Sequence, residues 1–415
     1  MKISDQAREF IWDCERGLNE AFRRIDAVEA VVQARVLASF QEHQVAARHF
    51  APSTGYGYDD IGRDTLDLVF AGAVQAEAAL VRPHFVNGTH AIFLALAGLA
   101  EPGDQILAIT GRPYDTLEEA IGIRGNAPQS LRRFGIGFEQ VPLRTDGEID
   151  LDTVMQLLQE RPRRIVYVQR SRGYGWRNSL RPDQMQKAFS QIMACAPDSV
   201  IVVDNCYGEF TCAQEPTAFG AHILAGSLIK NPGGGLAPTG GYVAGRADLV
   251  ERIAQRLTVP GMGREVGSYA GDYRPFYQGL FLAPHTVAQC VKSAVLFARL
   301  FERLGMETLP ASTAVRSDII QSVRFSSAEQ LIRFCQSVQA ASPVDSFAVP
   351  QPWDMPGYAD QVIMAAGTFV QGATTELSAD GPVCPPYTAY LQGALTYAHG
   401  RIAAMLAYDA LQAVQ

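Results

Sequence analysis

Hydrophobic and polar positions follow different rhythms along this chain. Residues 5–48 contain few glycines or prolines and repeat their apolar side chains at helical spacing, which predicts a helical N-terminal segment. The stretch FAPSTGYGYDDIGRDT then breaks the rhythm with glycines, a proline and two tyrosines. Turn-forming residues of this kind indicate an exposed arm between the first helices and the main body.

From about residue 67 to residue 300, short apolar runs alternate with amphipathic segments. The runs predict strands in ALVRPHFVNG, DQILAIT, RRIVYVQRS, SVIVVDN and HILAGSLI. Helices are predicted between them, in THAIFLALAGLA, IDLDTVMQLLQE and PDQMQKAFSQIMACA. Apolar strands separated by helices are typical of a parallel sheet covered on both faces, and thus of an α/β domain. Ligands bind such sheets at the carboxyl ends of the strands.

The last part of the chain has a different pattern. A long helix, AQCVKSAVLFARLFERLGM, leads to SDIIQSVRF, SAEQLIRFCQSVQAA and QVIMAAGTFV, and then to a predicted final helix, YTAYLQGALTYAHGRIAAMLAYDALQA. These segments predict a smaller α+β unit. Three parts follow for a chain of 415 residues. They are a helical segment with an arm (1–66), a large domain (67–300) and a small C-terminal domain (301–415).

Composition narrows the class of protein. Hydrophobic residues make up 47% of the chain and charged residues 19%, which is typical of a packed globular protein. The net charge of −8 argues against a nucleic-acid partner and against a basic membrane-binding surface. Apolar runs fall short of the roughly 18 residues that a membrane span needs. Seven scattered cysteines without a C-x-x-C pair favour reduced thiols, so we expect a cytoplasmic enzyme.

Lysine is scarce, and the position of Lys230 is distinctive. The lysines are Lys2, Lys187, Lys230 and Lys292, and only Lys230 ends an apolar run and opens a glycine-rich turn. Desolvation lowers the pKa of a lysine and makes its amine a nucleophile, as a Schiff base requires. The alternative is a lysine that extends from a strand end into solvent.

Ser227 and Lys230 also form an S-x-x-K motif, which in other proteins marks a serine acyl-enzyme. That chemistry needs companion K-T-G and S-D-N motifs, and both are missing from the sequence. The predicted strand around Ser227 is also the wrong setting, because this serine should begin a helix. The acyl-enzyme reading is therefore disfavoured.

Other polar residues follow the predicted strands at the same edge. Asp204 lies near the C-terminal end of SVIVVDN, where its carboxylate can bind a metal, cap the next element or pair with the ring nitrogen of pyridoxal phosphate. Gly88 and Thr89 begin a helix, and a helix N-terminus suits a phosphate. Tyr114 follows the next strand, where its ring can stack on a cofactor. The seven histidines do not cluster at metal-ligand spacing, so no metal site is predicted.

In this chain order, the motifs resemble those of fold-type-I pyridoxal-phosphate enzymes. VDNCYGEF is similar to a stretch of the Cys/Met-metabolism group within them. Several longer motifs are similar to the aluminium-resistance or methionine-gamma-lyase-like family, which includes cystathionine beta-lyase-like proteins: GYGYDDIGRDTLD, VNGTHAI, GRPYDTLEEAIG, GSLIKNPGGGLAPTGGYVAG and FVQGATTELSADGP. The resemblance covers residues 55–390. It implies an aspartate aminotransferase-like large domain with a mainly parallel sheet and a smaller α+β domain.

The resemblance also implies roles for single residues. Lys230 forms the Schiff base with pyridoxal 5'-phosphate and moves the proton at the substrate Cα. Asp204 pairs with the ring nitrogen, and Tyr114 stacks on the ring and takes part in catalysis. The implied phosphate ligands are Gly88, Thr89 and Ser227.

In the Cys/Met group, a tyrosine and an arginine of the partner subunit also reach the active site. Tyr56, Tyr58 and Arg63 lie in the corresponding arm, which implies a homodimer or homotetramer with shared sites and a catalytic role for Tyr56. The Tyr-x-Arg spacing of the group is not reproduced here. The group's small-domain arginine, which binds the substrate carboxylate, is also missing from TTELSADGPVCPPY. Because an arginine suits a carboxylate best, Arg172 and Arg264 are the predicted substitutes.

The implied function is that of a carbon–sulfur lyase. Such an enzyme performs β- or γ-elimination on cystathionine, cysteine or methionine and releases a thiol, a 2-oxo acid and ammonia. A γ-replacement enzyme or an aminotransferase is the alternative, because a fold alone does not determine the reaction. A non-catalytic, cofactor-binding protein of stress or metal tolerance is a further alternative.

Overall fold

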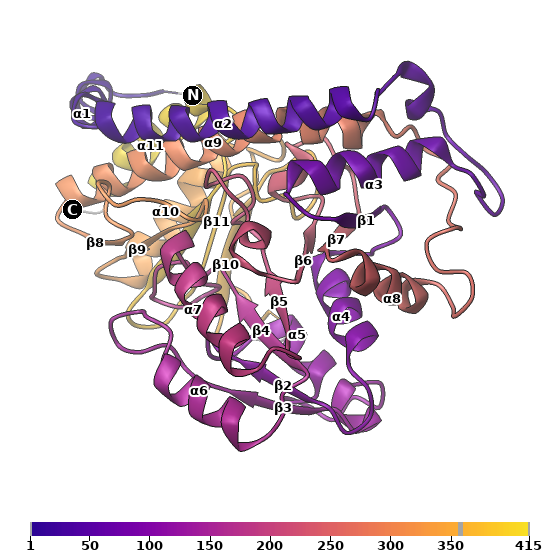
Figure 1. Cartoon of the computed structure of the whole chain (residues 1–415). Coiled ribbons are helices and arrows are strands. Elements are labelled where there is room, and N and C mark those ends of the chain that lie inside the picture. Colours follow the sequence, from indigo (N-terminus) through magenta and orange to yellow (C-terminus); the bar gives the residue numbers. More distant parts are fainter. Residues whose placement is uncertain (1, 356–359, 414–415) are drawn as a thin grey trace.

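The computed structural model describes residues 2–355 and 360–413, and its strands form two separate sheets (Figure 1). The larger sheet has seven strands in the order β1-β7-β6-β5-β4-β2-β3. In that spatial order, the strands are β1 (Ala78–Arg82), β7 (Gly241–Gly245), β6 (Ile223–Ser227), β5 (Val200–Asp204), β4 (Ile165–Gln169), β2 (Gln105–Ala108) and β3 (Gly137–Gln140).

This sheet is mainly parallel. Strands β6, β5, β4, β2 and β3 run in one direction, whereas β7 is antiparallel to both of its neighbours, β1 and β6. The predicted fold class is therefore confirmed. The sequence patterns did not identify β7, which is the strand that follows the lysine turn.

Helices cover both faces of the larger sheet, as a strand buried on two sides requires. Side chains alternate along β5: Ile201 and Val203 join one apolar cluster, while Val200 and Val202 join the other. The first cluster lies under α3 (Ile61–Ala73), α6 (Leu151–Glu160), α7 (Pro182–Cys195) and α9 (Arg274–Arg303). The second lies under α4 (Gly88–Leu99), α5 (Asp115–Ile121) and α8 (Ala247–Leu257).

The smaller sheet is antiparallel and lies in the C-terminal part. Its strands, in spatial order, are β10 (Val362–Ala366), β11 (Ser378–Pro382), β12 (Thr388–Gln392), β9 (Gln321–Arg324) and β8 (Glu307–Leu309). Helices α10 (Ala328–Ala341) and α11 (Tyr397–Gln412) share its apolar cluster. Short 3-10 helices complete the chain: η1 (Ala47–Phe50), η2 (Leu131–Phe134), η3 (Pro216–Phe219) and η4 (Asn231–Gly233).

The prediction of one continuous final helix from residue 387 is wrong. Residues 388–392 form strand β12, which pairs with β11 on one side and with β9 on the other. Gly393 then takes a φ of 80°, a left-handed conformation that suits glycine, and α11 begins at Tyr397. Pairing on both edges therefore outweighs the helical preference of this segment.

The first two helices, α1 (Asp5–Arg16) and α2 (Asn19–Glu42), pack on the rest of the chain. Helix α2 lies along α9 in Figure 1, and the two are in extensive contact. Ala7, Ile11 and Cys14 of α1 are fully buried in the C-terminal apolar cluster. Helix α9 is long and apolar enough to span a membrane by length and composition, but most of that stretch is buried inside the fold. Such burial is typical of a core helix.

Candidate active site

A cavity of about 340 Å³ lies where the two sheets approach each other. The large sheet contributes the carboxyl ends of β4, β5 and β6, and the small sheet contributes residues of β10 and β11. Asp204 and Lys230 line the cavity from the first side, and Asp380 lines it from the second. This is the edge at which ligands bind to open α/β sheets.

Lys230 follows β6 and extends over an aromatic ring. Its Nζ atom lies 3.9 Å from the centre of the Tyr207 ring. Burial alone would lower the pKa of Lys230, but Cys206, Tyr207 and the carboxyls of Asp204 and Glu209 together raise it. The pKa direction predicted from the sequence is therefore wrong. Lys230 is an ammonium at neutral pH and must lose a proton before it can act as a nucleophile.

Asp204 ends β5 and presents its carboxyl to the cavity from a buried position. The Cys206 N–H donates a hydrogen bond to its Oδ1 atom at 3.1 Å, and the Tyr167 hydroxyl donates to Oδ2 at 3.4 Å. Burial raises the pKa of Asp204, and the nearby Lys230 charge opposes that rise. A buried carboxyl with these partners can pair with a cationic ring nitrogen.

The N-terminus of α4 forms a candidate anion site. The Asn87 side chain caps the helix by accepting a hydrogen bond from the His90 N–H at 2.9 Å. Gly88 allows a close approach to β6, because a Cβ atom there would lie 3.1 Å from the Ser227 Cβ. The Ser227 hydroxyl is buried, lines the cavity and has no hydrogen-bond partner among the described residues. An unpartnered hydroxyl beside a helix N-terminus fits a phosphate group.

Three more cavity residues carry buried oxygens that lack a partner within the described chain, namely Gln169 Oε1, Ser171 Oγ and Thr374 Oγ1. Sequence reasoning assigned none of the three to the site, because a single polar residue at a strand end, such as Gln169, or in a loop carries no pattern. Buried polar atoms are nearly always hydrogen-bonded in native proteins. Their number around one cavity indicates that the cavity is built for a polar ligand.

Two tyrosines border the cavity. Tyr114 precedes α5, is 37% exposed and lines the cavity, and its stacking on a cofactor ring stays a prediction. Tyr207 was not predicted, although it contacts Lys230 directly. Its φ of 71° is unusual for a bulky residue, and strained backbone of this kind is concentrated at functional sites.

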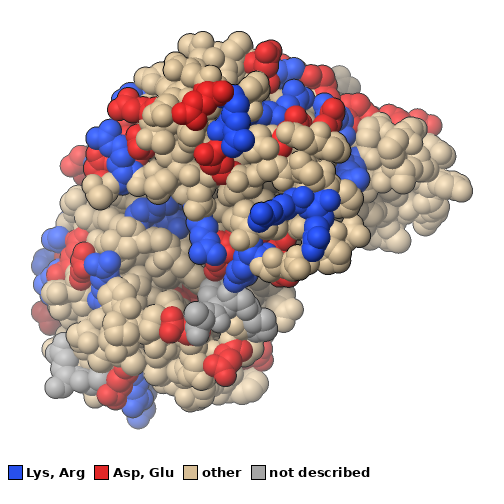
Figure 2. Space-filling model, turned by 90° about the horizontal axis from the view of Figure 1, so that it is seen from below, with Lys and Arg blue, Asp and Glu red and all other residues tan. Residues whose placement is uncertain are grey.

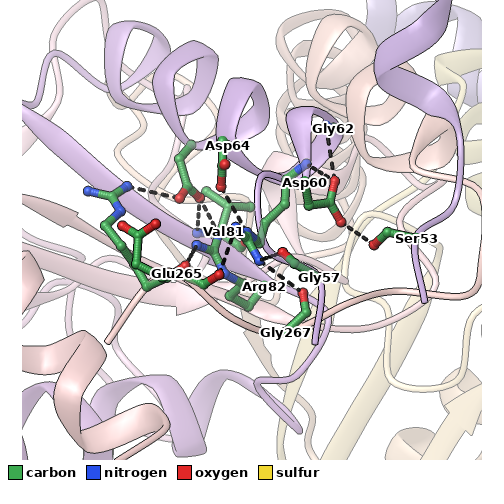
Figure 3. Close-up of polar contacts among 12 residues, drawn as sticks. Ser53, Gly57, Asp60, Gly62, Asp64, Val81, Arg82, Glu265 and Gly267 are labelled. Carbon is green, nitrogen blue, oxygen red and sulfur yellow. Dashed lines mark hydrogen bonds and ion pairs between the residues drawn. The ribbon is translucent and has the colours of Figure 1, made fainter. Parts of the chain in front are cut away.

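Both arginines proposed for the substrate carboxylate are engaged elsewhere. Arg172 forms a fully buried ion pair with Asp318 and donates to the Leu309 carbonyl at 2.7 Å. Arg264 pairs with Asp67 at 2.9 Å, next to the Arg82 shown in Figure 3. Neither residue lines the cavity, although Arg172 lines an adjoining pocket. The chain's own geometry therefore gives no support to either assignment.

Arg63 of the arm is turned inward. It is buried, and it donates to the Gly57 carbonyl at 2.7 Å and to the Asp64 carboxylate at 2.8 Å. Asp60 caps α3 and also accepts hydrogen bonds from Ser53 and, at 2.8 Å, from the Tyr273 hydroxyl. Figure 3 shows these contacts around Gly57, Asp60 and Asp64. Arg63 therefore braces the arm from inside.

Tyr56 and Tyr58 are turned outward on the braced arm. They are 70% and 61% exposed, and their stacked rings lie 5.7 Å apart. Together with Arg63 they are absent from the lining of the cavity in the described chain. The roles predicted for these three residues therefore stay predictions.

Fold and site together define a class of protein. The two-sheet architecture, with a lysine, an aspartate and the N-terminus of α4 at the strand ends, is that of fold-type-I pyridoxal-phosphate enzymes. The chain has the same fold as the pyridoxal-5'-phosphate-dependent protein YhfS of Escherichia coli, with a TM-score of 0.63 and 19% identity. The alignment covers 94% of this chain and 97% of that one.

Within this class, the chain belongs to the methionine gamma-lyase family, whose family model matches residues 7–412. It is 49% identical to the uncharacterised protein YnbB of Bacillus subtilis strain 168, over 95% of this chain and 93% of that protein. It is also similar to a crystal structure from Clostridium novyi NT described as a carbon-sulfur lyase involved in aluminum resistance. That pair has a TM-score of 0.94 and 46% identity, and covers 98% of this chain and 96% of the other.

Proposed function

We propose that this chain is a pyridoxal-phosphate-dependent carbon–sulfur lyase that splits a sulfur-containing amino acid into a thiol, a 2-oxo acid and ammonia. The observation that carries the proposal is the arrangement of Lys230, Asp204 and the unpartnered Ser227 hydroxyl around one cavity. Family membership and the name of the Clostridium novyi protein support it.

The residues of the cavity fit the cofactor. Lys230 would bind its aldehyde, Asp204 would hold its ring nitrogen, and Tyr114 would pack against its ring. The backbone N–H groups at the start of α4 and the Ser227 hydroxyl would hold its phosphate. When bound, pyridoxal phosphate supplies an electron sink for negative charge formed at the substrate Cα.

Lys230 then carries the proton transfers of the proposed reaction. Because its pKa is raised, Lys230 is protonated at neutral pH and must first lose a proton. As a free amine, it would then take the proton from the substrate Cα. The carbon–sulfur bond would break with its electron pair on sulfur, and the thiolate would leave with the proton that Lys230 took from the substrate Cα. Water finally releases the remaining carbon skeleton as a 2-oxo acid and ammonia.

We further propose that two copies of the chain share their sites. The exposed pair of Tyr56 and Tyr58 sits on an arm that Arg63 and Asp60 hold in place. A braced arm with outward aromatic rings suits contact with a second subunit. The face of the molecule drawn in Figure 2 carries both positive and negative side chains. Its described part therefore lacks the extended basic surface that binds nucleic acid.

The first experiment tests the cofactor and the lysine. Purified protein supplied with pyridoxal phosphate should absorb near ~420 nm, and borohydride should remove that band and leave the cofactor attached to Lys230. Lys230→Ala should lose the band. Lys187→Ala, which removes an exposed lysine on α7, should keep it. A colourless wild-type protein, or cofactor on another lysine, would contradict the proposal.

The second experiment tests the reaction. Protein loaded with pyridoxal phosphate is mixed with L-cystathionine, L-cysteine or L-methionine, and thiol and 2-oxo acid are assayed separately. A lyase forms both products in equal amounts. A 2-oxo acid without thiol indicates an aminotransferase, and a loaded protein that forms neither product from any of the three is not a lyase for these substrates.

A further inference from the structure

The small sheet places a second carboxylate in the cavity. Asp380 lies on β11, where it pairs with Met364 of β10 and with Tyr390 of β12. It lines the cavity from the side opposite the strand ends that carry Asp204 and Lys230. No role was predicted for it from the sequence.

The charge of Asp380 has no cationic partner in the part of the chain that the structure describes. The Tyr174 hydroxyl donates a hydrogen bond to its Oδ2 atom. The charged residues that line the cavity are Asp204, Lys230 and Asp380, and Lys230 interacts electrostatically with Asp204. Among the described residues, the pKa of Asp380 is set by burial and by hydrogen bonds, and none of these causes is a cation. Its negative charge is therefore uncompensated.

Asp380 is half-buried in the cavity wall, where a carboxylate without a cationic partner costs free energy that a cationic ligand would recover. Burial raises the pKa of Asp380 to about 6, while the hydrogen bond from Tyr174 opposes the rise, so the group is still mainly ionised at pH 7. A purely structural acceptor for the Tyr174 hydroxyl needs no charge, because an asparagine would accept that bond equally well. The charge itself therefore calls for a functional explanation.

The free charge on the small-sheet wall of the cavity is thus negative. The two arginines that the sequence predicted for the substrate carboxylate do not line the cavity. Arg172 is paired with Asp318, and Arg264 is paired with Asp67. A negative wall attracts a cationic group of the ligand and repels an anionic one. In the proposed reaction, the α-amino group of the substrate would be engaged at the cofactor aldehyde, so the cation would be a different group of the substrate.

We propose that Asp380 is a specificity-determining residue that binds a second, protonated amine of the substrate, carried by the substituent on sulfur. The preferred substrates are then thioethers of cysteine or homocysteine whose other arm ends in an amine. This inference rests on the proposed lyase function for the kind of substrate. A charge-assisted hydrogen bond to a half-buried carboxylate makes such an amine a strong selector.

The test uses two pairs of substrates that differ in the amine alone. S-(2-aminoethyl)-L-cysteine is compared with S-propyl-L-cysteine, and L-cystathionine with S-(3-carboxypropyl)-L-cysteine. For the holoenzyme we expect kcat/KM to favour the amine by about tenfold or more in at least one pair. Asp380→Asn should reduce that preference to about twofold or less, because it keeps the shape and removes the charge.

Asp345→Asn is the matched control. It makes the same change of acid to amide at an exposed position of the C-terminal part, outside the cavity lining, and it should keep the wild-type preference. Equal kcat/KM values within both pairs in the wild type, or a preference that survives in Asp380→Asn, would overturn the inference.

Binding measurements distinguish a failure of this inference from a failure of the lyase proposal. If the wild type splits none of the four compounds, the lyase proposal fails, and calorimetric titration of the holoenzyme with the same pairs decides the role of Asp380. Tighter binding of the amine that Asp380→Asn abolishes supports the subsite. Equal affinities within each pair in the wild type refute it.

Discussion

Glu209 is a buried carboxyl with a single side-chain donor. It lies on the loop after β5, where the Tyr242 hydroxyl donates a hydrogen bond to its Oε1 atom at 2.8 Å. Its Oε2 atom has no partner among the described residues. Burial raises the pKa of Glu209 to about 8, against the opposing effect of its hydrogen bonds. The folded protein therefore holds this proton at pH 7, whereas the unfolded chain releases it.

This difference predicts a pH-dependent effect of Glu209→Gln. Between the unfolded pKa of 4.5 and the folded value of about 8, the folded state binds the extra proton, so wild-type stability falls as the pH rises. Glutamine has no proton to lose. The variant should gain a few kcal/mol, at most ~5, in free energy of unfolding relative to wild type between pH 5 and pH 8. Urea unfolding at both pH values measures the gain, and a difference that is constant with pH would refute the raised pKa.

The role of a single residue could be predicted where its chemical type and its place in the local pattern point to the same function. It could not be predicted where the partners of that residue come from distant segments. Lys230 stands out because it is a rare lysine at the end of an apolar run. The direction of its pKa depends on Asp204 and Glu209, whose approach no local pattern shows. The pairing of Arg172 with Asp318 spans 146 residues and removes an arginine that looks free in the sequence. Asp380 sits in a motif quoted for its family resemblance, yet its place in the cavity depends on the approach of the second sheet.

At the scale of elements, the backbone of α9 contacts the backbone of Gly233 and Gly234, at the end of η4. A Cβ atom at Gly279 of α9 would lie 2.2 Å from the Gly233 carbonyl oxygen, and one at Gly234 would lie 2.3 Å from the Gly279 carbonyl oxygen. Gly234 also has a φ of 55°, which disfavours other residues. Since η4 directly follows Lys230, this contact sets the position of the lysine.

Gly279→Ala should therefore disturb both stability and the site. We expect the free energy of unfolding to fall by about 1–3 kcal/mol, because the backbone must move to admit the methyl group. The shift of η4 should also lower the amount of cofactor bound per chain. Gln278→Ala, an exposed change one residue earlier on the same helix, should leave both unchanged. Urea unfolding and cofactor content test both variants, and a fully stable, fully loaded Gly279→Ala would contradict the close contact.

Helix α4 gives a prediction that separates capping from anion binding. Asn87→Ala removes the cap on the His90 N–H and should cost about 1 kcal/mol of stability. Asn87→Asp keeps a capping oxygen and suits the helix dipole, so stability should be retained. Its negative charge beside the predicted phosphate should weaken cofactor binding, by roughly tenfold. Equilibrium dialysis with pyridoxal phosphate measures the affinity, and unchanged affinity in Asn87→Asp would place the phosphate elsewhere.

Elements were predictable where local pattern and tertiary context agree. The apolar run of β5 is buried on both faces and was assigned from its pattern, as were β4 and α7. Residues 388–392 were assigned to a helix because they precede a strongly helical segment. Their strand forms only because β9 and β11 offer edges on both sides, and that information is absent from the local pattern.

At the scale of the whole molecule, shared sites predict complementation between subunits. Lys230→Ala and the double variant Tyr56→Ala/Tyr58→Ala should each be inactive alone. Random mixing of the two by co-refolding should restore about a quarter of wild-type activity, because half of the dimers are hybrids and each hybrid has one intact site. Mixed protein that stays at the background of the single variants shows that the arm serves no neighbouring site. Light scattering of the wild type reports the number of subunits.

The two ends of the chain are fastened to each other. The Ser4 N–H donates to the Asp409 carboxylate at 2.9 Å. Glu15 of α1 accepts a hydrogen bond from the Tyr397 hydroxyl at 2.7 Å and forms an ion pair with Arg401 at 3.0 Å. Ribosomes add ~5–20 residues per second, so roughly 20 to 80 seconds separate the synthesis of α1 from that of α11. During that interval, the apolar face of α1 has left the ribosome before the helix on which it packs exists. Helix α1 is thus made well before its apolar face can be buried against α11, and that face stays exposed on the nascent chain during the whole interval.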